Sequence, residues 1–233
     1  GKLTEPWYGK WIGTGRTNDK KNNLPPELFQ RTFTANAVPA RAVLYVSALG
    51  IYEAELNGRK VGSIYFAPGY THYQTYLQFQ TYDVTSQILS GENDLRITVA
   101  NGWYLGQIGN KNNNYGNCRG LIAELHMWDA LGRHTIIGTD ESWRYTADTP
   151  LRFADFYNGQ TINCLLDDET VWQWGQAKVL PEIRKTLVPH YGAYVIEDQR
   201  LHPCSSQRLG SCTIYDFGQN HAGVLRLKVK ASK

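Results

Sequence analysis

The residues of this chain that could carry out hydrolytic chemistry are acidic, and the most obvious are Asp155, Asp167, Asp168 and Glu169. Hydrolysis of a glycosidic bond normally uses two carboxyl groups that face each other across the sugar, far enough apart in the inverting case to admit a water molecule. A pair can always be chosen among 21 acidic residues. Because an acidic run on a turn is usually a solvated face, we assign no catalytic residue from this pattern.

Residue types that suit sugar binding occur together in two stretches. One is Asn101 to Tyr104 with the asparagine-rich run that follows it, and the other runs from Asp155 to Gln160. Aromatic rings can cover the apolar face of a sugar, while amides and carboxylates can match its hydroxyl groups, which must be paired once they are buried. The candidate carbohydrate-binding residues are Trp103, Tyr104, Asn112, Asn114, Asp155, Tyr157 and Gln160.

We expect a sugar site where the loop after Trp103 meets the segment 155–160, because Val99 and Phe153 lie at strand ends and both loops can gather at one rim. Two interpretations of Trp103 stay open: its ring faces a sugar, or it closes the core. The asparagine-rich loop is favoured as an interdomain or sugar-facing surface. Replacing Trp103 or Asp155 by Ala is expected to weaken binding with little change in melting temperature.

Motifs for other chemistries do not match. None of the 6 His lies in an HExxH pattern or near a GxSxG elbow, which excludes the common metalloprotease and serine-hydrolase signatures. The 4 Cys lack the CxxC spacing of a zinc site. Buried free thiols are expected for them, with a Cys204–Cys212 disulfide as the main alternative, and such a disulfide would indicate an oxidising compartment.

The elements that must position these residues are predicted to be β-strands. Residues 51–56 alternate between apolar and acidic side chains, and Asn57-Gly58 then favours a type I′ turn into 59–62. Further strands are predicted at 77–82, 95–99 and 121–127, with a short helix near 86–89. Strands at short spacing with Gly, Asn and Pro between them indicate an all-β fold.

Composition limits the classes of function. The 233 residues are 42% hydrophobic and 19% charged, as in folded proteins, and can bury a sizeable core. The net charge of +3 comes from scattered basic residues, so we expect no nucleic-acid binding. No stretch of eighteen apolar residues occurs, so no membrane insertion is expected. The compartment is left open, with an extracellular or periplasmic location favoured over a cytoplasmic one.

Three motifs occur in the order found in a known family. They are LYVSALGIYEAELNGRKVG, APGYTHYQTYLQFQTYDVT and SGENDLRITVANGWYLG. This series resembles the N-terminal β-sandwich domain of bacterial α-L-rhamnosidases of glycoside hydrolase family 78. The resemblance implies a jelly-roll, galactose-binding-like sandwich in which Trp143 is part of the core. In that family the inverting catalytic machinery lies in a C-terminal (α/α)6 barrel, and the chain contains no helical-repeat sequence of that kind.

The resemblance also suggests a division of the chain and two departures from the family pattern. Residues 1–35 would supply N-terminal strands, 36–178 the sandwich, and 179–233 the start of a next β-sandwich domain. Gln160 and Asn163 stand where the family usually has acidic residues. Amides keep their hydrogen bonds but lose the charge, so a calcium ion is conceivable and a tightly bound one is not favoured. No other cofactor is expected.

These observations lead to one functional hypothesis and two alternatives. The hypothesis is a non-catalytic N-terminal portion of an α-L-rhamnosidase that contributes carbohydrate recognition and supports the catalytic domain of the same polypeptide. Its partners would be rhamnose-containing glycans or glycosides and that catalytic domain. The alternatives are a stand-alone lectin-like carbohydrate-binding module and a purely structural interdomain brace.

Overall fold

The structure is a computed structural model, and it describes residues 5–18, 24–181, 183 and 185–228. It divides into two compact units, Gly1–Ile196 and Glu197–Lys233. Among the described residues, no helix is both long enough and apolar enough to cross a membrane. The candidate site residues all belong to the first unit, which is described first.

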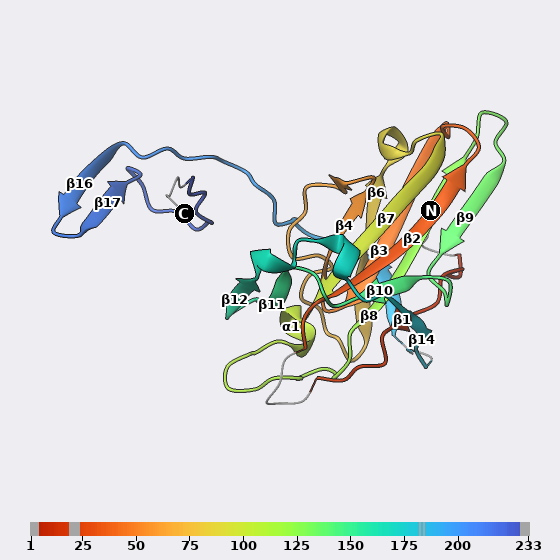
Figure 1. Ribbon diagram of the computed structural model, residues 1–233, viewed down its shortest axis with the longest axis horizontal. Coiled ribbons are helices and arrows are strands. Elements are labelled where there is room, and N and C mark those ends of the chain that lie inside the picture. The colour runs from red at the N-terminus through yellow and green to blue at the C-terminus, as the bar shows by residue number, and fades with distance from the viewer. Residues whose placement is uncertain (1–4, 19–23, 182, 184, 229–233) are drawn as a thin grey trace. The chain divides into compact units, whose positions relative to one another are not determined.

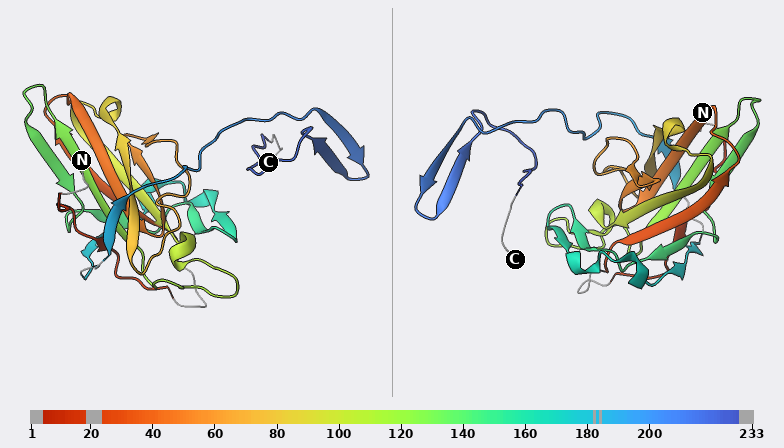
Figure 2. Two further views of the ribbon diagram at one scale, coloured as in Figure 1. Left: turned by 180° about the vertical axis from the view of Figure 1, so that it is seen from behind. Right: turned by 45° about the horizontal axis from the view of Figure 1, so that its top comes forward.

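The first unit is a sandwich of two facing β-sheets (Figures 1 and 2). One sheet has the order β14-β1-β8-β3-β6-β15, with β9 also paired to β8, and the other has the order β13-β10-β2-β7-β4-β5. The strands of the first sheet are β1 (Ile12–Gly13), β3 (Arg41–Leu49), β6 (Tyr76–Asp83), β8 (Gly120–Trp128), β9 (His134–Gly138), β14 (Lys178–Val179) and β15 (Thr186–Pro189). Those of the second are β2 (Glu27–Ala35), β4 (Ile51–Leu56), β5 (Arg59–Lys60), β7 (Gly91–Ala100), β10 (Arg144–Thr146) and β13 (Gly175–Gln176).

Short elements cover the ends of the sheets. They are the 3-10 helices η1 (Thr85–Gln87), η2 (Cys164–Leu166) and η3 (Glu169–Val171), the single α-helical turn α1 (Gly102–Leu105), and the hairpin of β11 (Leu151–Asp155) and β12 (Gly159–Ile162). The nearly all-β architecture expected from the sequence is confirmed. The expected helix near 86–89 is the short η1, whereas the helical turn directly after β7 was not expected.

Alternating side chains build the core between the sheets. In β4, Tyr52, Ala54 and Leu56 are buried while the two glutamates between them are exposed, as a half-buried strand requires. Trp143 is fully buried and donates a hydrogen bond to the Gly138 carbonyl at 3.0 Å. Full burial of one Leu or Ile side chain stabilises a fold by about 1.5–3 kcal/mol, so the many such residues here account for the sandwich.

The Asn57-Gly58 hairpin has the backbone predicted for it. Asn57 has φ of 54° and Gly58 has φ of 72°, the two positive values of a type I′ turn. The Asn57 side chain also donates to the Gln87 carbonyl and accepts from the Asp94 amide, at 2.8 and 2.9 Å. The turn residue therefore ties η1 and β7 to the hairpin as well.

The sequence did not predict the placement of two strands. β2 lies inside its sheet between β7 and β10. Its alternation is interrupted by polar residues that are nonetheless buried, such as Gln30. β15 pairs with β6 in parallel, in an otherwise antiparallel sandwich. A parallel pairing between segments over a hundred residues apart has no turn signal in the sequence.

The second unit contains one hairpin, β16 (Ser205–Leu209) paired with β17 (Cys212–Asp216). Every residue of both strands is exposed. Residues 223–228 alternate in hydrophobicity but form no strand, and Leu225 and Leu227 are largely exposed. An alternating strand needs a sheet to pack on, and the described residues of this unit supply none.

The cysteines do not match the expectation of buried thiols. All four are free: Cys118 is half-buried, and Cys164, Cys204 and Cys212 are exposed. The alternative of a Cys204–Cys212 bond is not formed in the structure.

A buried ion pair joins the ends of three strands in the first unit. Arg119, which precedes β8, lies 3.5 Å from Glu27 at the start of β2, and both side chains are 2% exposed. Arg119 also donates to the Asn101 side chain just after β7 and to the carbonyls of Leu24 and Pro25. Thr14 donates to the same Glu27 oxygen at 2.7 Å. The pair thus fixes the end of the sandwich from which α1 begins.

Removing the cation should cost more than neutralising the anion. In Arg119→Met the Glu27 carboxylate stays buried without its counter-charge, a change that typically costs about 3–5 kcal/mol of folding free energy. In Glu27→Gln the guanidinium keeps its three oxygen acceptors on Leu24, Pro25 and Asn101, so a smaller loss is expected. Urea unfolding of the two variants and the parent chain measures both losses.

Acid should partly rescue Arg119→Met. Burial raises the pKa of Glu27, so the folded chain binds this proton more readily than the unfolded chain, and stability falls as pH rises through that interval. Without Arg119 this destabilisation is larger, and it should shrink as the pH is lowered from 7 toward about 4.5, near the unfolded pKa of a glutamate. Equal losses for both variants at every pH would show that the pair is not what holds these segments.

Candidate functional site

The two loops that the sequence predicts to meet do lie side by side. α1 carries Trp103, and the hairpin of β11 and β12 carries Phe156 and Tyr157 at its turn (Figures 1 and 2). The rings of Trp103 and Phe156 are 4.5 Å apart, and Asn158 donates to the side chain of Gln107 at 2.9 Å. The loops are therefore packed on each other through both an aromatic contact and a polar contact.

Trp103 is half-buried at the centre of an aromatic surface cluster. Besides Phe156, it makes edge contacts with Phe66 and Tyr70 at ring distances of 6.2 and 6.1 Å. Phe66, Tyr70, Phe156 and Tyr157 are 38%, 55%, 40% and 63% exposed. We call these five residues the aromatic rim. Adjoining exposed rings of this size are uncommon on a surface without a function.

Asp155 holds the rim together from below and is only 6% exposed. One carboxylate oxygen accepts from the Gln107 amide at 2.7 Å, and the other accepts from the amides of Tyr157 and Asn158 at 2.8 and 3.1 Å. The chain passes so close that a Cβ on Gly106 would lie 2.5 Å from the carboxylate and 2.1 Å from a carbonyl oxygen. Asp155 therefore positions both loops, and its oxygens do not face solvent.

The remaining candidates are spread over different surroundings. Tyr104 is 6% exposed, packs on Tyr73 at 5.3 Å, and has its pKa raised to about 12 by burial. Asn114 donates to the Lys111 carbonyl within its own loop. Asn112 is half-buried, and Gln160 is exposed on β12. Of the seven candidates, the structure gathers Trp103, Asp155 and Tyr157.

The asparagine-rich loop is fastened to the rest of the unit. The Asn113 amide donates to the Leu105 carbonyl at 2.9 Å, and its side chain donates to the Asn18 carbonyl at 3.2 Å. Asn18 in turn donates through its backbone to Asn117 and through its side chain to Asn101. The loop is thus built on the N-terminal segment, and most of its residues from 112 to 118 are half-buried.

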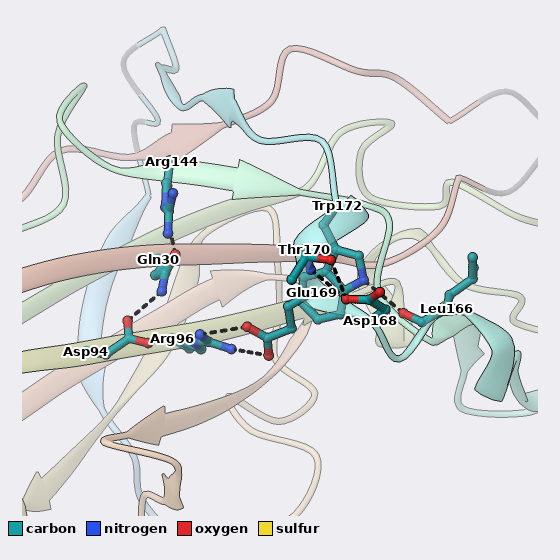
Figure 3. Close-up of polar contacts among 9 residues, drawn as sticks. All are labelled: Gln30, Asp94, Arg96, Arg144, Leu166, Asp168, Glu169, Thr170 and Trp172. Carbon is teal, nitrogen blue, oxygen red and sulfur yellow. Dashed lines mark hydrogen bonds and ion pairs between the residues drawn. The ribbon is translucent and has the colours of Figure 1, made fainter.

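Glu169 of the acidic run fastens the segment after β12 to the second sheet (Figure 3). Glu169 accepts two hydrogen bonds from Arg96 of β7, at 2.7 and 3.1 Å. Arg96 also donates to Asp94 at 2.7 Å, and the other oxygen of Asp94 accepts from Gln30 of β2 at 2.7 Å. The hydrogen bonds from Arg96 lower the pKa of Glu169. These hydrogen bonds link the segment that follows β12 to β7 and β2, so the role of Glu169 is structural.

Two more of the acidic residues considered for hydrolysis are also engaged in the fold. Asp168 caps η3 by accepting from the Thr170 amide at 3.0 Å, and Asp155 closes the β11–β12 turn. Metal chemistry has no support either: among the residues that the structure describes, no group of three or more His, Cys, Asp or Glu side chains could hold an ion. What this region exposes to solvent is the aromatic rim.

A cavity of about 380 Å³ beside the rim was missed by sequence reasoning. It lies between the loop 64–70, two side chains of β6, Trp103 and the segment 190–195. The residues after β15 reach this place only because β15 pairs with β6. No local pattern in the sequence predicts that pairing, although the density of tyrosines in 65–76 and 191–194 is visible there.

Comparison with known proteins identifies the family. The sequence model of the alpha-L-rhamnosidase N-terminal domain matches residues 37–181, which is well over half of the chain. The chain belongs to this family. The resemblance noted from the three motifs is thereby confirmed, and so is the fold that it implied.

The relatives of this alpha-L-rhamnosidase N-terminal domain are much longer proteins. An alpha-L-rhamnosidase of Streptomyces avermitilis is 33% identical over 219 residues, which cover 82% of this chain and 19% of that relative. The crystal structure of an alpha-L-rhamnosidase from Aspergillus terreus is 29% identical with a TM-score of 0.82, covering 91% of this chain and 26% of that one. A structure of the Streptomyces avermitilis enzyme complexed with L-rhamnose is 30% identical with a TM-score of 0.75, covering 85% and 20%.

Within this alpha-L-rhamnosidase N-terminal domain, Asp155 should matter for stability. The sequence suggested that Asp155→Ala would have little effect on the melting temperature. The structure instead leads us to expect a loss of about 1–3 kcal/mol in the free energy of unfolding, because three backbone amides lose their acceptor. Tyr157→Ala, a change in the same turn at an exposed side chain, should stay within about 0.5 kcal/mol. Urea unfolding of the two variants tests this, and equal stabilities would contradict the positioning role.

Proposed function

We propose that this chain is the non-catalytic N-terminal portion of an α-L-rhamnosidase, an enzyme that hydrolyses terminal α-L-rhamnosides. The observation that carries the proposal is the family match over residues 37–181, together with relatives that are alpha-L-rhamnosidases and extend far beyond the matched region. A catalytic domain in the same polypeptide and rhamnose-containing glycosides are the partners that follow from it.

The geometry supports a binding and supporting role for the chain. Asp155, Asp168 and Glu169 are engaged with backbone amides or with Arg96. A general acid or base has to be free to reach the glycosidic oxygen or a water molecule. Three of the four carboxylates that the sequence offers for hydrolysis are instead used to hold loops and strands.

Two functions of the aromatic rim are compatible with its exposure. The first is carbohydrate recognition, in which rings stack on sugars. The second is support of the catalytic domain, in which the same rings pack against another part of the polypeptide, since interfaces are enriched in aromatic residues. The division of the chain into residues 1–35, 36–178 and 179–233 is part of this proposal, with the last range beginning the next β-sandwich domain.

The purified chain should release no rhamnose from an aryl α-L-rhamnoside. The assay compares the chain with buffer and with an intact α-L-rhamnosidase, using chain purified by two independent routes to exclude a contaminating enzyme. Release that follows the chain through both purifications, and that is abolished by Glu169→Gln or Asp155→Asn, would contradict the non-catalytic assignment.

A further inference from the structure

We propose that the cavity beside the aromatic rim is a binding pocket for one neutral pyranose ring, with the Gln78 amide as its polar contact and Tyr194 as its stacking wall. None of the candidates chosen from the sequence, apart from Trp103, lines this cavity. Its volume of about 380 Å³ lies in the range of small-molecule sites. The choice of L-rhamnose as the test ligand rests on the proposed function.

The floor of the pocket is the polar end of the sandwich core. Tyr52 and Tyr82 share a hydrogen bond at 3.0 Å between the sheets, and Tyr52 donates to the side-chain carbonyl of Gln80 at 2.8 Å. The Gln80 amide group donates to the Pro68 carbonyl at 3.1 Å. Gln80 is only 1% exposed and has its hydrogen bonds satisfied, so it fixes the floor and is not itself a contact for a ligand.

Gln78 differs from Gln80 in one decisive respect. It lies two residues earlier on β6, on the same face of the strand, and it lines the cavity at 5% exposure. Its side-chain amide has no hydrogen-bond partner among the described residues of the chain. The amide is not among the fully enclosed unpaired groups, and it offers one acceptor and two donors to whatever enters the cavity. Neighbouring hydroxyl groups of a sugar present that combination of acceptor and donors.

The side walls are rings that are held in place before any ligand binds. Tyr194 stacks on His190 with ring centroids 4.2 Å apart, yet 43% of Tyr194 stays exposed. The Val195 carbonyl accepts from the Tyr65 amide at 2.8 Å, and the Tyr191 hydroxyl is 2.6 Å from that of Tyr76. Because the segment 190–195 is anchored at both ends, little ordering is left to oppose binding.

The lining also decides what kind of ligand fits. Among the residues that the structure describes, it contains six aromatic residues besides His190 and no Asp, Glu, Lys or Arg. The aromatic ones are Tyr65, Phe66, Tyr70, Trp103, Tyr191 and Tyr194. The Lys60 ammonium lies 4.3 Å from the Tyr65 ring but is paired with Glu53 at 3.0 Å. A charged sugar or a phosphate would therefore compete with Glu53 for it, which is costly. A carboxylate-held calcium ion has no ligands there. A neutral pyranose, with hydroxyls on one edge and C–H groups on its faces, matches amide and rings together.

The test is titration of the whole 233-residue chain with L-rhamnose and methyl α-L-rhamnoside, followed by calorimetry and by the side-chain NH₂ resonances of Gln78 in NMR spectra. The variants are Gln78→Met, which keeps the volume on a rigid strand, and Tyr194→Ala. Tyr215→Ala, at an exposed tyrosine of β17 that does not line the cavity, is the matched control. Melting temperatures are measured for each, so that loss of binding is separated from loss of fold.

We expect the parent chain and Tyr215→Ala to bind equally, with or without a calcium chelator, and Gln78→Met and Tyr194→Ala to bind at least about tenfold more weakly. If the parent chain binds and Gln78→Met binds as well, the pocket is elsewhere, while carbohydrate recognition by the chain stands. If the parent chain binds neither sugar at tens of millimolar, the pocket proposal is wrong. The non-catalytic assignment is judged separately, by the rhamnose-release assay.

Discussion

The buried contact between Arg119 and Glu27 is the interaction on which the placement of the site depends. A β-sandwich buries the backbone of its strand ends only if every polar group there finds a partner. Arg119 supplies donors for the Leu24 and Pro25 carbonyls and for Asn101, and so joins the start of β2, the end of β7 and the start of β8. Since α1 begins directly after Asn101, the same contact sets the direction in which Trp103 leaves the sheet.

The loops around Trp103 are held by hydrogen bonds from backbone amides to a carboxylate, whereas the strand ends are held by an ion pair. Asp155 binds the amide of Gln107 after α1 and two amides of its own turn, so two loops from distant parts of the chain are held at one carboxylate. The aromatic rim follows from these hydrogen bonds. The turn that Asp155 closes places the ring of Phe156 4.5 Å from that of Trp103. Rings presented in this way keep a defined orientation while staying exposed, which favours stacking on a flat partner.

Local sequence patterns predicted much of the sandwich. Contacts between residues far apart in the chain could not be predicted from such patterns. The Asn57-Gly58 turn follows from residue types alone, the burial of Trp143 is implied by the family resemblance, and both are confirmed. That the loops of Trp103 and Asp155 meet followed from their positions at strand ends. The inward direction of the Asp155 carboxylate could not be predicted, because its partners are backbone amides, which every residue except proline carries.

The pocket also depends on contacts that the sequence does not predict. Gln78 belongs to a strand whose alternation looks ordinary, and nothing near it in sequence shows that the core ends there. The segment 190–195 forms the opposite wall, and it is brought there by the parallel pairing of β15 with β6. That pairing is a long-range contact with no turn directly joining the two strands. Both Gln78 and Gln80 line the cavity, and they differ in that the Gln80 side chain is hydrogen-bonded to Tyr52 and to the Pro68 carbonyl.

Amides in place of acids give the site region a consistent chemical character. Asn163, one of the two amides noted as departures in the family resemblance, accepts from the Leu165 amide at 3.1 Å and caps η2. Gln160, the other, lies exposed on β12. In the part of the chain that the structure describes, neither residue belongs to a cluster that could hold a cation. The cavity is likewise lined by amides and rings without a charged side chain. Hydrogen bonds between neutral groups are individually weaker than charge-assisted ones, so recognition here has to rely on apolar stacking and on the fit of a whole ring.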